Sequence, residues 1–256
     1  MKTKLTILAI ILFIGVMVFS SYKIYTHYTK DKQYTDAFDR LAGIVEQAQS
    51  DEDTTVKTAP FTEDKTVLPD YNTLYLQNSN IVGWIRIDGT TINYPVMQTP
   101  DDPDYYLKHN FNKEYSSYGV PYAAGGCDVF EPSDNIIIYG HHIKNGKMFG
   151  ALEDYKSKNF YEKHKIIRFD TLTKKAEYEI ISVFKTVAYS ENGFAFYDFI
   201  DAVDEDEFNA YVSKCKELSL YDTGITAEYG DKLLTLSTCE YSSQNGRLVV
   251  VAKKIS

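Results

Sequence analysis

The strongest constraint on the fold is a series of short runs rich in isoleucine, valine and aromatic residues. The runs span 81–87, 91–96, 135–139, 166–169, 176–188, 232–236 and 247–255. Runs of this length and composition, bounded by turn-forming residues, are typical of β-strands. The Asp88-Gly89 pair between the first two runs predicts a tight turn, so these two strands should form a β-hairpin.

Helical patterns are few and short in the same region. They cover 70–77, 147–155 and 204–218. In the last of these, one face carries four apolar residues, which are Phe208, Tyr211, Val212 and Cys215. Many strands with few helices predict a mainly β fold, a barrel or closed sheet, with one helix inserted before the penultimate strand. A single domain of about 180 to 200 residues is reasonable for a chain of this length, and we place it at 71–256.

The first residues of the chain differ in kind from the rest. Lys2 and Lys4 precede a nearly unbroken apolar run from Leu5 to Phe19. Extended to Tyr22, the run has about 18 residues, which just spans a bilayer. Positive charges before an apolar span hold the N-terminus in the cytoplasm. We therefore predict a single-pass protein of the cell membrane, with its bulk outside the cytoplasm.

A cleaved signal peptide is the competing interpretation of this run. Val18 and Ser20 are small enough to serve a signal peptidase. However, Lys23, Tyr25 and the helix-like sequence that follows leave no clean small-residue cleavage site. This favours an uncleaved signal-anchor over residues 1–25.

Residues 26–70 are predicted to form a juxtamembrane helix and a linker. A helix is expected over 36–49, where five apolar residues recur at helical spacing: Phe38, Leu41, Ala42, Val45 and Ala48. Residues 50–69 are rich in Asp, Glu, Thr and Lys, with two prolines and little apolar content. That composition indicates a linker or a loosely held strap.

The net charge of −9 argues against a nucleic-acid partner, because nothing in the sequence forms a basic stripe. Neither a metal nor another cofactor is expected. The histidines at 109, 141, 142 and 164 lack the carboxylate or cysteine spacing of a metal cage. The acidic stretch 201–207 could suggest calcium, but acidic residues also favour the first turn of a helix, which explains it better.

The chain has three cysteines, an odd number for an exported protein, so at least one thiol is expected to be free. Cys127 and Cys215 could pair with each other, which would leave Cys239 reduced. The alternative, which we favour, is that both are small buried apolar residues.

Cys239 has the sequence context of a nucleophile. It lies where one predicted strand ends, and Arg247 begins the next. A thiol needs a base or a cationic neighbour to become a thiolate at neutral pH, and His141, just after an upstream strand, can supply either. Arginine stays protonated, so its plausible task is to donate hydrogen bonds to an oxyanion or a substrate carbonyl. The three side chains together can form and resolve a thioester.

The sequence around these residues closely resembles the class B sortases. The resemblance rests on Thr235-Leu236-Ser237-Thr238-Cys239 with the arginine after it, and on the histidine segment 138–144 followed by 147–150. It extends to the segments 78–85, 92–96, 105–107 and 110–111, and covers roughly Tyr71 to Ile255 in order. Segment 120–127 departs from the family pattern, which puts details of the peptide groove in doubt.

The resemblance implies an eight-stranded β-barrel and a membrane-anchored cysteine transpeptidase of Gram-positive bacteria. Its partners would be secreted proteins with a C-terminal sorting pentapeptide and a peptidoglycan precursor or cross-bridge amine. Cys239 would attack the carbonyl after the threonine of the pentapeptide, and the amine would resolve the thioester. His141 matches the catalytic histidine because it directly follows the glycine, whereas His142 is its neighbour. The helix before the penultimate strand resembles the insertion that walls the substrate groove.

Five further residues are expected to contact the peptide by the same resemblance. They are Leu107, Tyr197, Ser237, Thr238 and Glu240. Thr238 could help to polarise the scissile carbonyl through its backbone or hydroxyl, and Tyr197 could cover the peptide. Plain barrel packing is the alternative explanation for each of the five.

Two other functions stay open. One is a cysteine endopeptidase or hydrolase whose thioester goes to water, which an amine-acceptor assay would distinguish from a transpeptidase. The other is a catalytically silent envelope scaffold that holds peptides, against which the complete Cys-His-Arg trio argues.

Overall fold

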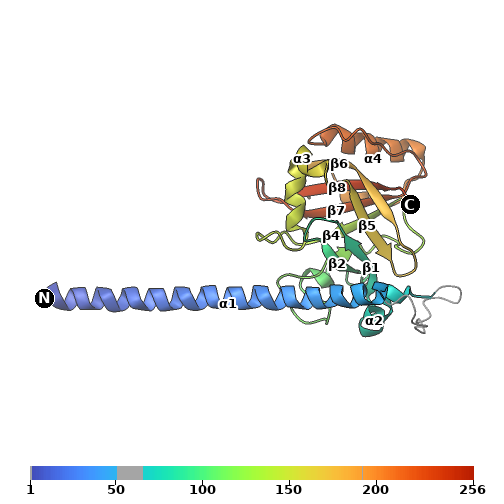
Figure 1. Cartoon of the computed structure of the whole chain (residues 1–256). Coiled ribbons are helices and arrows are strands. Elements are labelled where there is room, and N and C mark those ends of the chain that lie inside the picture. Colours follow the sequence, from blue (N-terminus) through green and yellow to red (C-terminus); the bar gives the residue numbers. More distant parts are fainter. Residues whose placement is uncertain (1, 51–65, 192) are drawn as a thin grey trace. The chain divides into compact units, whose positions relative to one another are not determined.

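The computed structural model describes residues 2–50, 66–191 and 193–256, and the expected linker falls largely on residues 51–65, outside this part. Figure 1 shows a long helix and a barrel. The chain divides into two compact units, one ending at Gly43 and the other spanning Ile44–Ser256.

The N-terminal unit is helical. Helix α1 spans Lys2–Ser50 without a break, so the expected anchor and the expected juxtamembrane helix are parts of one helix. No proline occurs before position 60 to interrupt it. The helix is long and apolar enough to cross a membrane. Large apolar side chains such as Leu12 and Phe13 are exposed, at 70% and 65% of their surface.

The second unit is a closed barrel of eight strands in the order β1-β2-β3-β4-β7-β8-β6-β5. The strands are β1 (Ile81–Arg86), β2 (Asn93–Met97), β3 (Tyr122–Ala123), β4 (Asn135–Tyr139), β5 (Ile166–Thr171), β6 (Glu177–Val187), β7 (Leu233–Cys239) and β8 (Gly246–Lys254). The β2–β3 and β4–β7 pairs are parallel and the other pairs are antiparallel. The predicted mainly β, closed fold is confirmed.

Short helices lie around the barrel. They are α2 (Pro69–Gln77), η1 (Tyr105–Leu107), η2 (Phe149–Lys156), α3 (Lys158–Tyr161), η3 (Phe196–Asp198) and α4 (Glu205–Leu218). Helix α4 precedes the penultimate strand, as expected. Its N-cap, Asp204, accepts a hydrogen bond from the backbone N–H of Glu207, so the acidic stretch does begin a helix.

Helix α4 covers one end of an outward-facing sheet surface. Alternate residues of a strand face opposite sides, so Leu233, Thr235, Ser237 and Cys239 of β7 share one face. At the Leu233 end this face packs under Phe208, Tyr211 and Cys215 of α4, in an apolar cluster. The Cys239 end of the same face lies outside this cluster, so α4 does not cover it and a ligand could reach it.

Three local expectations need correction. Strand β7 continues past 236 to Cys239, and the two-residue strand β3 was not predicted. The expected helix over 147–155 is a 3₁₀-helix that begins at Phe149. Gly146 and Met148 have positive φ angles of 78° and 52°, which prevent a regular helix from starting earlier.

Two of the three thiols, those of Cys127 and Cys215, are buried. Cys127 and Cys215 are free and not paired with each other, so the favoured alternative of small buried residues is confirmed. Cys127 Sγ lies 3.4 Å from the Asn135 carbonyl oxygen, to which it donates, and accepts from Ile137 N–H at 3.4 Å. Burial raises the pKa of Cys127 to about 11 and that of Cys215 to about 12.

Candidate active site

Strand register pairs two of the three predicted catalytic residues, and the third follows the end of a neighbouring strand. Arg247 of β8 lies directly opposite Cys239 of β7, so both side chains leave the sheet on the same face. In the parallel β4–β7 pair, Tyr139 lies beside Ser237, and the N–H of Gly140 continues the ladder to the Ser237 carbonyl at 3.1 Å. His141 follows Gly140 directly and lines the same groove as Cys239 and Arg247.

The trio lines a groove of about 480 Å³ on the outward face of the barrel. Four of the five predicted peptide contacts also line it, namely Leu107, Tyr197, Ser237 and Thr238. The remaining wall comes from Pro103, Asp104, Tyr122, Ala124, Gly125, Tyr139, Gly140, Ala188, Tyr189 and Phe196. Cys239 is half-buried, which leaves its sulfur reachable, unlike the other two thiols.

His141 is fixed by the backbone of a different segment. Its Nε2 lies 2.7 Å from the carbonyl oxygen of Leu107 in η1. A carbonyl oxygen only accepts, so Nε2 carries a hydrogen here, and a neutral ring then has its acceptor at Nδ1. The preceding residue must be small, because a Cβ at Gly140 would lie 2.5 Å from the Phe149 ring. The imidazole therefore has a defined tautomer and a confined position.

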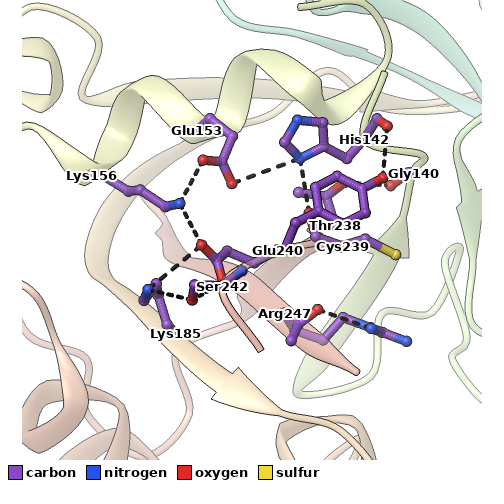
Figure 2. Close-up of polar contacts among 12 residues, drawn as sticks. Gly140, His142, Glu153, Lys156, Lys185, Thr238, Cys239, Glu240, Ser242 and Arg247 are labelled. Carbon is purple, nitrogen blue, oxygen red and sulfur yellow. Dashed lines mark hydrogen bonds and ion pairs between the residues drawn. The ribbon is translucent and has the colours of Figure 1, made fainter. Parts of the chain in front are cut away.

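Arg247 supplies a permanent positive charge on the other side of the thiol. Its Nη1 donates to the Gly246 carbonyl oxygen at 3.0 Å, which leaves most of the guanidinium's donor hydrogens for a ligand. Figure 2 shows the Cys239 sulfur and the Arg247 guanidinium on the same side of the turn between β7 and β8. An oxyanion formed next to this sulfur would meet donors that are already in place.

The groove residues differ in what their polar atoms can still do. The Ser237 hydroxyl is buried and has no hydrogen-bond partner among the described residues. The Thr238 hydroxyl donates to the Gly140 carbonyl at 2.8 Å, so its single hydrogen is engaged, and of the two expected routes to a substrate carbonyl only the backbone of Thr238 stays a prediction. The Tyr197 hydroxyl accepts from the N–H of Tyr189 at 3.1 Å, which ties two aromatic residues of one groove wall together.

Glu240 does not line the groove. It follows Cys239 and so points to the opposite side of the strand, where it is only 6% exposed. Its carboxylate accepts from Lys156 Nζ at 2.7 Å and from the Ser242 N–H at 2.9 Å (Figure 2). Burial alone would raise the pKa of Glu240, but these hydrogen bonds outweigh it and lower the pKa to about 2.

His142 faces away from the groove as well. Its Nδ1 donates to the Cys239 carbonyl oxygen at 2.9 Å and lies 3.7 Å from Glu153 Oε1. The neighbouring histidines therefore have different places, His141 beside the thiol and His142 against the backbone of the same residue. His141 lines the groove and His142 does not, and the catalytic role of His141 stays a prediction.

Sequence patterns missed part of the groove wall. Tyr122 donates to Asp104 at 3.0 Å, and both residues line the groove although neither was singled out. Tyr122 lies in the segment that departs from the family pattern. Tyr189, at a positive φ of 57° and 79% exposed, was also missed. Its exposure and its ring contact with Tyr197 appear only in the structure, so no sequence signal pointed to it.

Comparison with known proteins agrees with this arrangement. Residues 85–255 match the sequence profile of the family described as the sortase domain. Sortase B of Staphylococcus aureus is 33% identical over 257 aligned residues, which cover 100% of this chain and 98% of that protein. The chain belongs to the sortase family, class B.

Solved sortase structures show the same fold. A Staphylococcus aureus sortase B–substrate complex has a TM-score of 0.76 at 31% identity, covering 89% of this chain and 99% of that one. A sortase B complexed with triglycine has a TM-score of 0.76 at 32% identity, covering 88% of this chain and 99% of the other. The sortase fold therefore accounts for nearly all of the barrel unit.

Proposed function

We propose that this sortase is a cysteine transpeptidase that transfers secreted proteins to a cell-wall amine. The observation that supports the proposal most directly is that His141, Cys239 and Arg247 line one groove, with Arg247 directly opposite Cys239 in the strand register. A nucleophile, an acid or base, and an oxyanion donor are the three groups that acyl transfer requires.

In the first half-reaction, the Cys239 thiolate attacks the carbonyl carbon after the threonine of a sorting pentapeptide. The carbonyl π electrons move to oxygen, and Arg247 donates hydrogen bonds to the resulting oxyanion. The oxyanion then collapses, the peptide C–N bond breaks, and the protonated His141 gives a proton to the departing amine. The product is a thioester between Cys239 and the secreted protein.

In the second half-reaction, a primary amine of a peptidoglycan precursor or cross-bridge attacks the thioester carbonyl. His141 takes a proton from that amine, an amide bond forms, and the Cys239 sulfur leaves. The two half-reactions consume one amide and form another, so no cofactor is required. Crystallised relatives in complex with a substrate and with triglycine support a peptide donor and an amine acceptor for this chain.

Groove residues would hold the pentapeptide. The unpartnered Ser237 hydroxyl is placed to bond a peptide group, and Leu107 and Tyr197 supply apolar surface. Because Glu240 lies outside the groove, we assign it no contact with the peptide.

We also propose that α1 anchors the protein in the cell membrane, with the N-terminus in the cytoplasm and the barrel outside. The exposed apolar side chains of the helix support this, since water is a poor surrounding for them. Protease added outside intact protoplasts tests the orientation. It should degrade the barrel, whereas survival of the barrel until lysis would reverse the assignment.

The enzymatic proposal is tested with the full chain in detergent micelles. The chain is incubated with a panel of sorting-type peptides, with and without triglycine, and products and protein adducts are read by mass spectrometry. Transpeptidation predicts an acyl adduct on Cys239, cleavage after threonine, and a ligated product that requires triglycine. Cleavage without ligation would indicate a hydrolase. Peptide binding without an adduct or cleavage would indicate a silent scaffold.

A further inference from the structure

A network of charged residues lies behind the strand that carries the nucleophile, on the side away from the groove. Lys156, at the end of η2, is its centre. Its Nζ lies 2.5 Å from Glu153 Oε2 and 2.7 Å from Glu240 Oε1. Figure 2 shows the lysine between the two carboxylates, with Lys185 of β6 on the far side of Glu240. One ammonium group thus joins η2 to the residue that follows Cys239.

Two routes lead from Lys156 to the catalytic strand end. In the first, Glu240 accepts hydrogen bonds from the N–H and the hydroxyl of Ser242, so the carboxylate holds the turn between Cys239 and Arg247. Lys185 adds a hydrogen bond to the Ser242 hydroxyl oxygen at 2.9 Å. Glu240 and Lys185 therefore hold the turn between Cys239 and Arg247 through Ser242.

The second route passes through His142. Glu153 Oε1 lies 3.7 Å from His142 Nδ1, and that nitrogen donates to the carbonyl oxygen of Cys239 at 2.9 Å. Lys156 holds the other oxygen of the same Glu153 carboxylate. Glu153 Oε1 has no hydrogen-bond partner among the described residues, so this second link is an electrostatic contact that exists as an ion pair only when His142 is protonated.

The local helix type makes this arrangement possible. Side chains three residues apart eclipse each other in a 3₁₀-helix, and η2 is a 3₁₀-helix. Glu153 and Lys156 are three residues apart and so point to the same side.

Burial makes the lysine hard to replace. Glu240 is 6% exposed and Lys156 is 32% exposed in their side chains. A buried carboxylate that loses its partner must move, become protonated or admit water, because an unpaired buried charge is strongly unfavourable. Without Lys156, Glu153 and Glu240 would also lack the cation that lies between them. Lys185, 3.5 Å from Glu240, reaches only one of the two.

We propose that Lys156 is a positioning residue for the transpeptidation described above. It touches neither peptide nor thiol, but sets the placement of Cys239 and Arg247 relative to each other through Glu240 and through Glu153 and His142. The inference rests on the proposed function for its kinetic consequence. Its structural consequence, an ordered turn over 240–246, can be measured without any substrate.

The test compares three variants of the full chain in detergent. Lys156→Met removes the charge and keeps the length, Lys156→Arg keeps a cation that can bridge two carboxylates, and Lys214→Met is the matched control. Lys214 pairs with Glu217 on α4 at 2.9 Å, an ion pair of similar length on the surface. For each variant, kcat and KM with peptide and triglycine are measured, together with amide hydrogen exchange.

Lys156→Met is expected to lower kcat at least about tenfold and change KM less than about twofold, because small displacements of reacting groups affect the chemical step. Hydrogen exchange over 240–247 should accelerate, with no change in β1 or β2. Lys156→Arg should recover kcat to within about threefold of wild type. Lys214→Met should match wild type in every readout.

A double variant tests whether Lys156 acts through Glu240. If both belong to one contact, Lys156→Met combined with Glu240→Gln should lower kcat much less than the product of the two single effects. Independent, multiplying effects would overturn this route. Wild-type kcat and exchange in Lys156→Met would overturn the whole inference. If the wild-type chain itself shows no turnover, the proposed function fails, and unchanged exchange in Lys156→Met would separately reject the positioning role.

Discussion

The two ends of the outward face of β7 are stabilised in opposite ways. At the Leu233 end, α4 buries the strand under Phe208, Tyr211 and other apolar side chains. At the Cys239 end, the same face is open as a groove, and the strand is held from its reverse side by Glu240 and its lysine partners. A strand end that must admit a peptide cannot be covered by packing, so ion pairs on the reverse side take over that role.

The same comparison separates the three thiols. Cys127 and Cys215 lie in the apolar cluster, where burial raises the pKa of each thiol, whereas Cys239 lies in the groove beside a histidine and an arginine. A raised pKa keeps a thiol protonated and therefore unreactive at neutral pH. Environment, rather than residue type, distinguishes the nucleophile from the two inert cysteines.

The largest expected effect is on turnover, and it comes from comparing the loss of the groove thiol, Cys239, with the loss of a buried thiol, Cys215. Cys239→Ala should lower turnover by about 10⁴-fold or more, since covalent catalysis is lost, while stability changes by less than about 0.5 kcal/mol. Cys215→Ala should do the reverse, with turnover kept and about 1 kcal/mol of stability lost. Peptide-ligation rates and urea unfolding measure both. Residual turnover above about one per cent in Cys239→Ala would assign the nucleophile elsewhere.

Alkylation compares the thiols within one molecule. With iodoacetamide at about pH 8, Cys239 should react about 10³-fold faster than Cys127 or Cys215, because the buried thiols react only after local unfolding. Peptide mapping by mass spectrometry gives the three rates, and in guanidinium chloride the rates should converge. Comparable rates in the folded protein would show that the apolar end is not closed.

Arg247→Lys tests the donor geometry at the open end. It should lower kcat/KM by about 100-fold, because an ammonium group cannot reproduce the fork of guanidinium donors at an oxyanion. Arg168→Lys on β5 is the matched control, since Arg168 pairs with Asp88 and Glu177 outside the groove. A near wild-type rate in the Arg247→Lys enzyme would remove Arg247 from the mechanism.

The smallest expected effect is the pH dependence of the free energy of unfolding that comes from Glu240, which lies behind the Cys239 end of β7. The pKa of Glu240 is lowered to about 2 in the folded chain, so its contribution is full above the unfolded pKa near 4.5 and is lost as the pH falls toward 2. Between about pH 6 and pH 3 we expect a loss of about 2 kcal/mol from this group. Urea unfolding of wild type and Glu240→Gln measures it, and equal losses in both would contradict it.

The sequence predicted the barrel well because its strands carry strong local signals. The runs ending at Tyr139 and beginning near Arg247 are apolar and bounded by turn residues, and the asparagine-to-tyrosine strand was predicted at its observed limits. The two residues of β3 carry no such signal. They form a strand only because they pair with β2 and β4, which lie elsewhere in the sequence. The start of η2 depends on two positive φ angles that composition does not reveal.

For the site, motif spacing predicted which residues gather but not which way each points. Glu240 is adjacent to Cys239 in the chain, yet strand alternation sends it to the reverse side, where Lys156 and Lys185 meet it. The hydroxyl of Thr238 likewise donates to the carbonyl of Gly140, just after β4, which the sequence around Thr238 does not reveal. These partners lie far away in sequence, so no local pattern could identify them.

The closed sheet limits how a peptide can be recognised. Strand β8 pairs with β6 and β7 along almost its whole length, and β7 pairs with β4 from Leu233 to Ser237, so neither offers a long unpaired edge to which an extended peptide could add as a further strand. Main-chain ladders of that kind bind many sequences nearly alike. A ligand of these two strands would instead lie across their outward face, where the side chains that line the groove can select it.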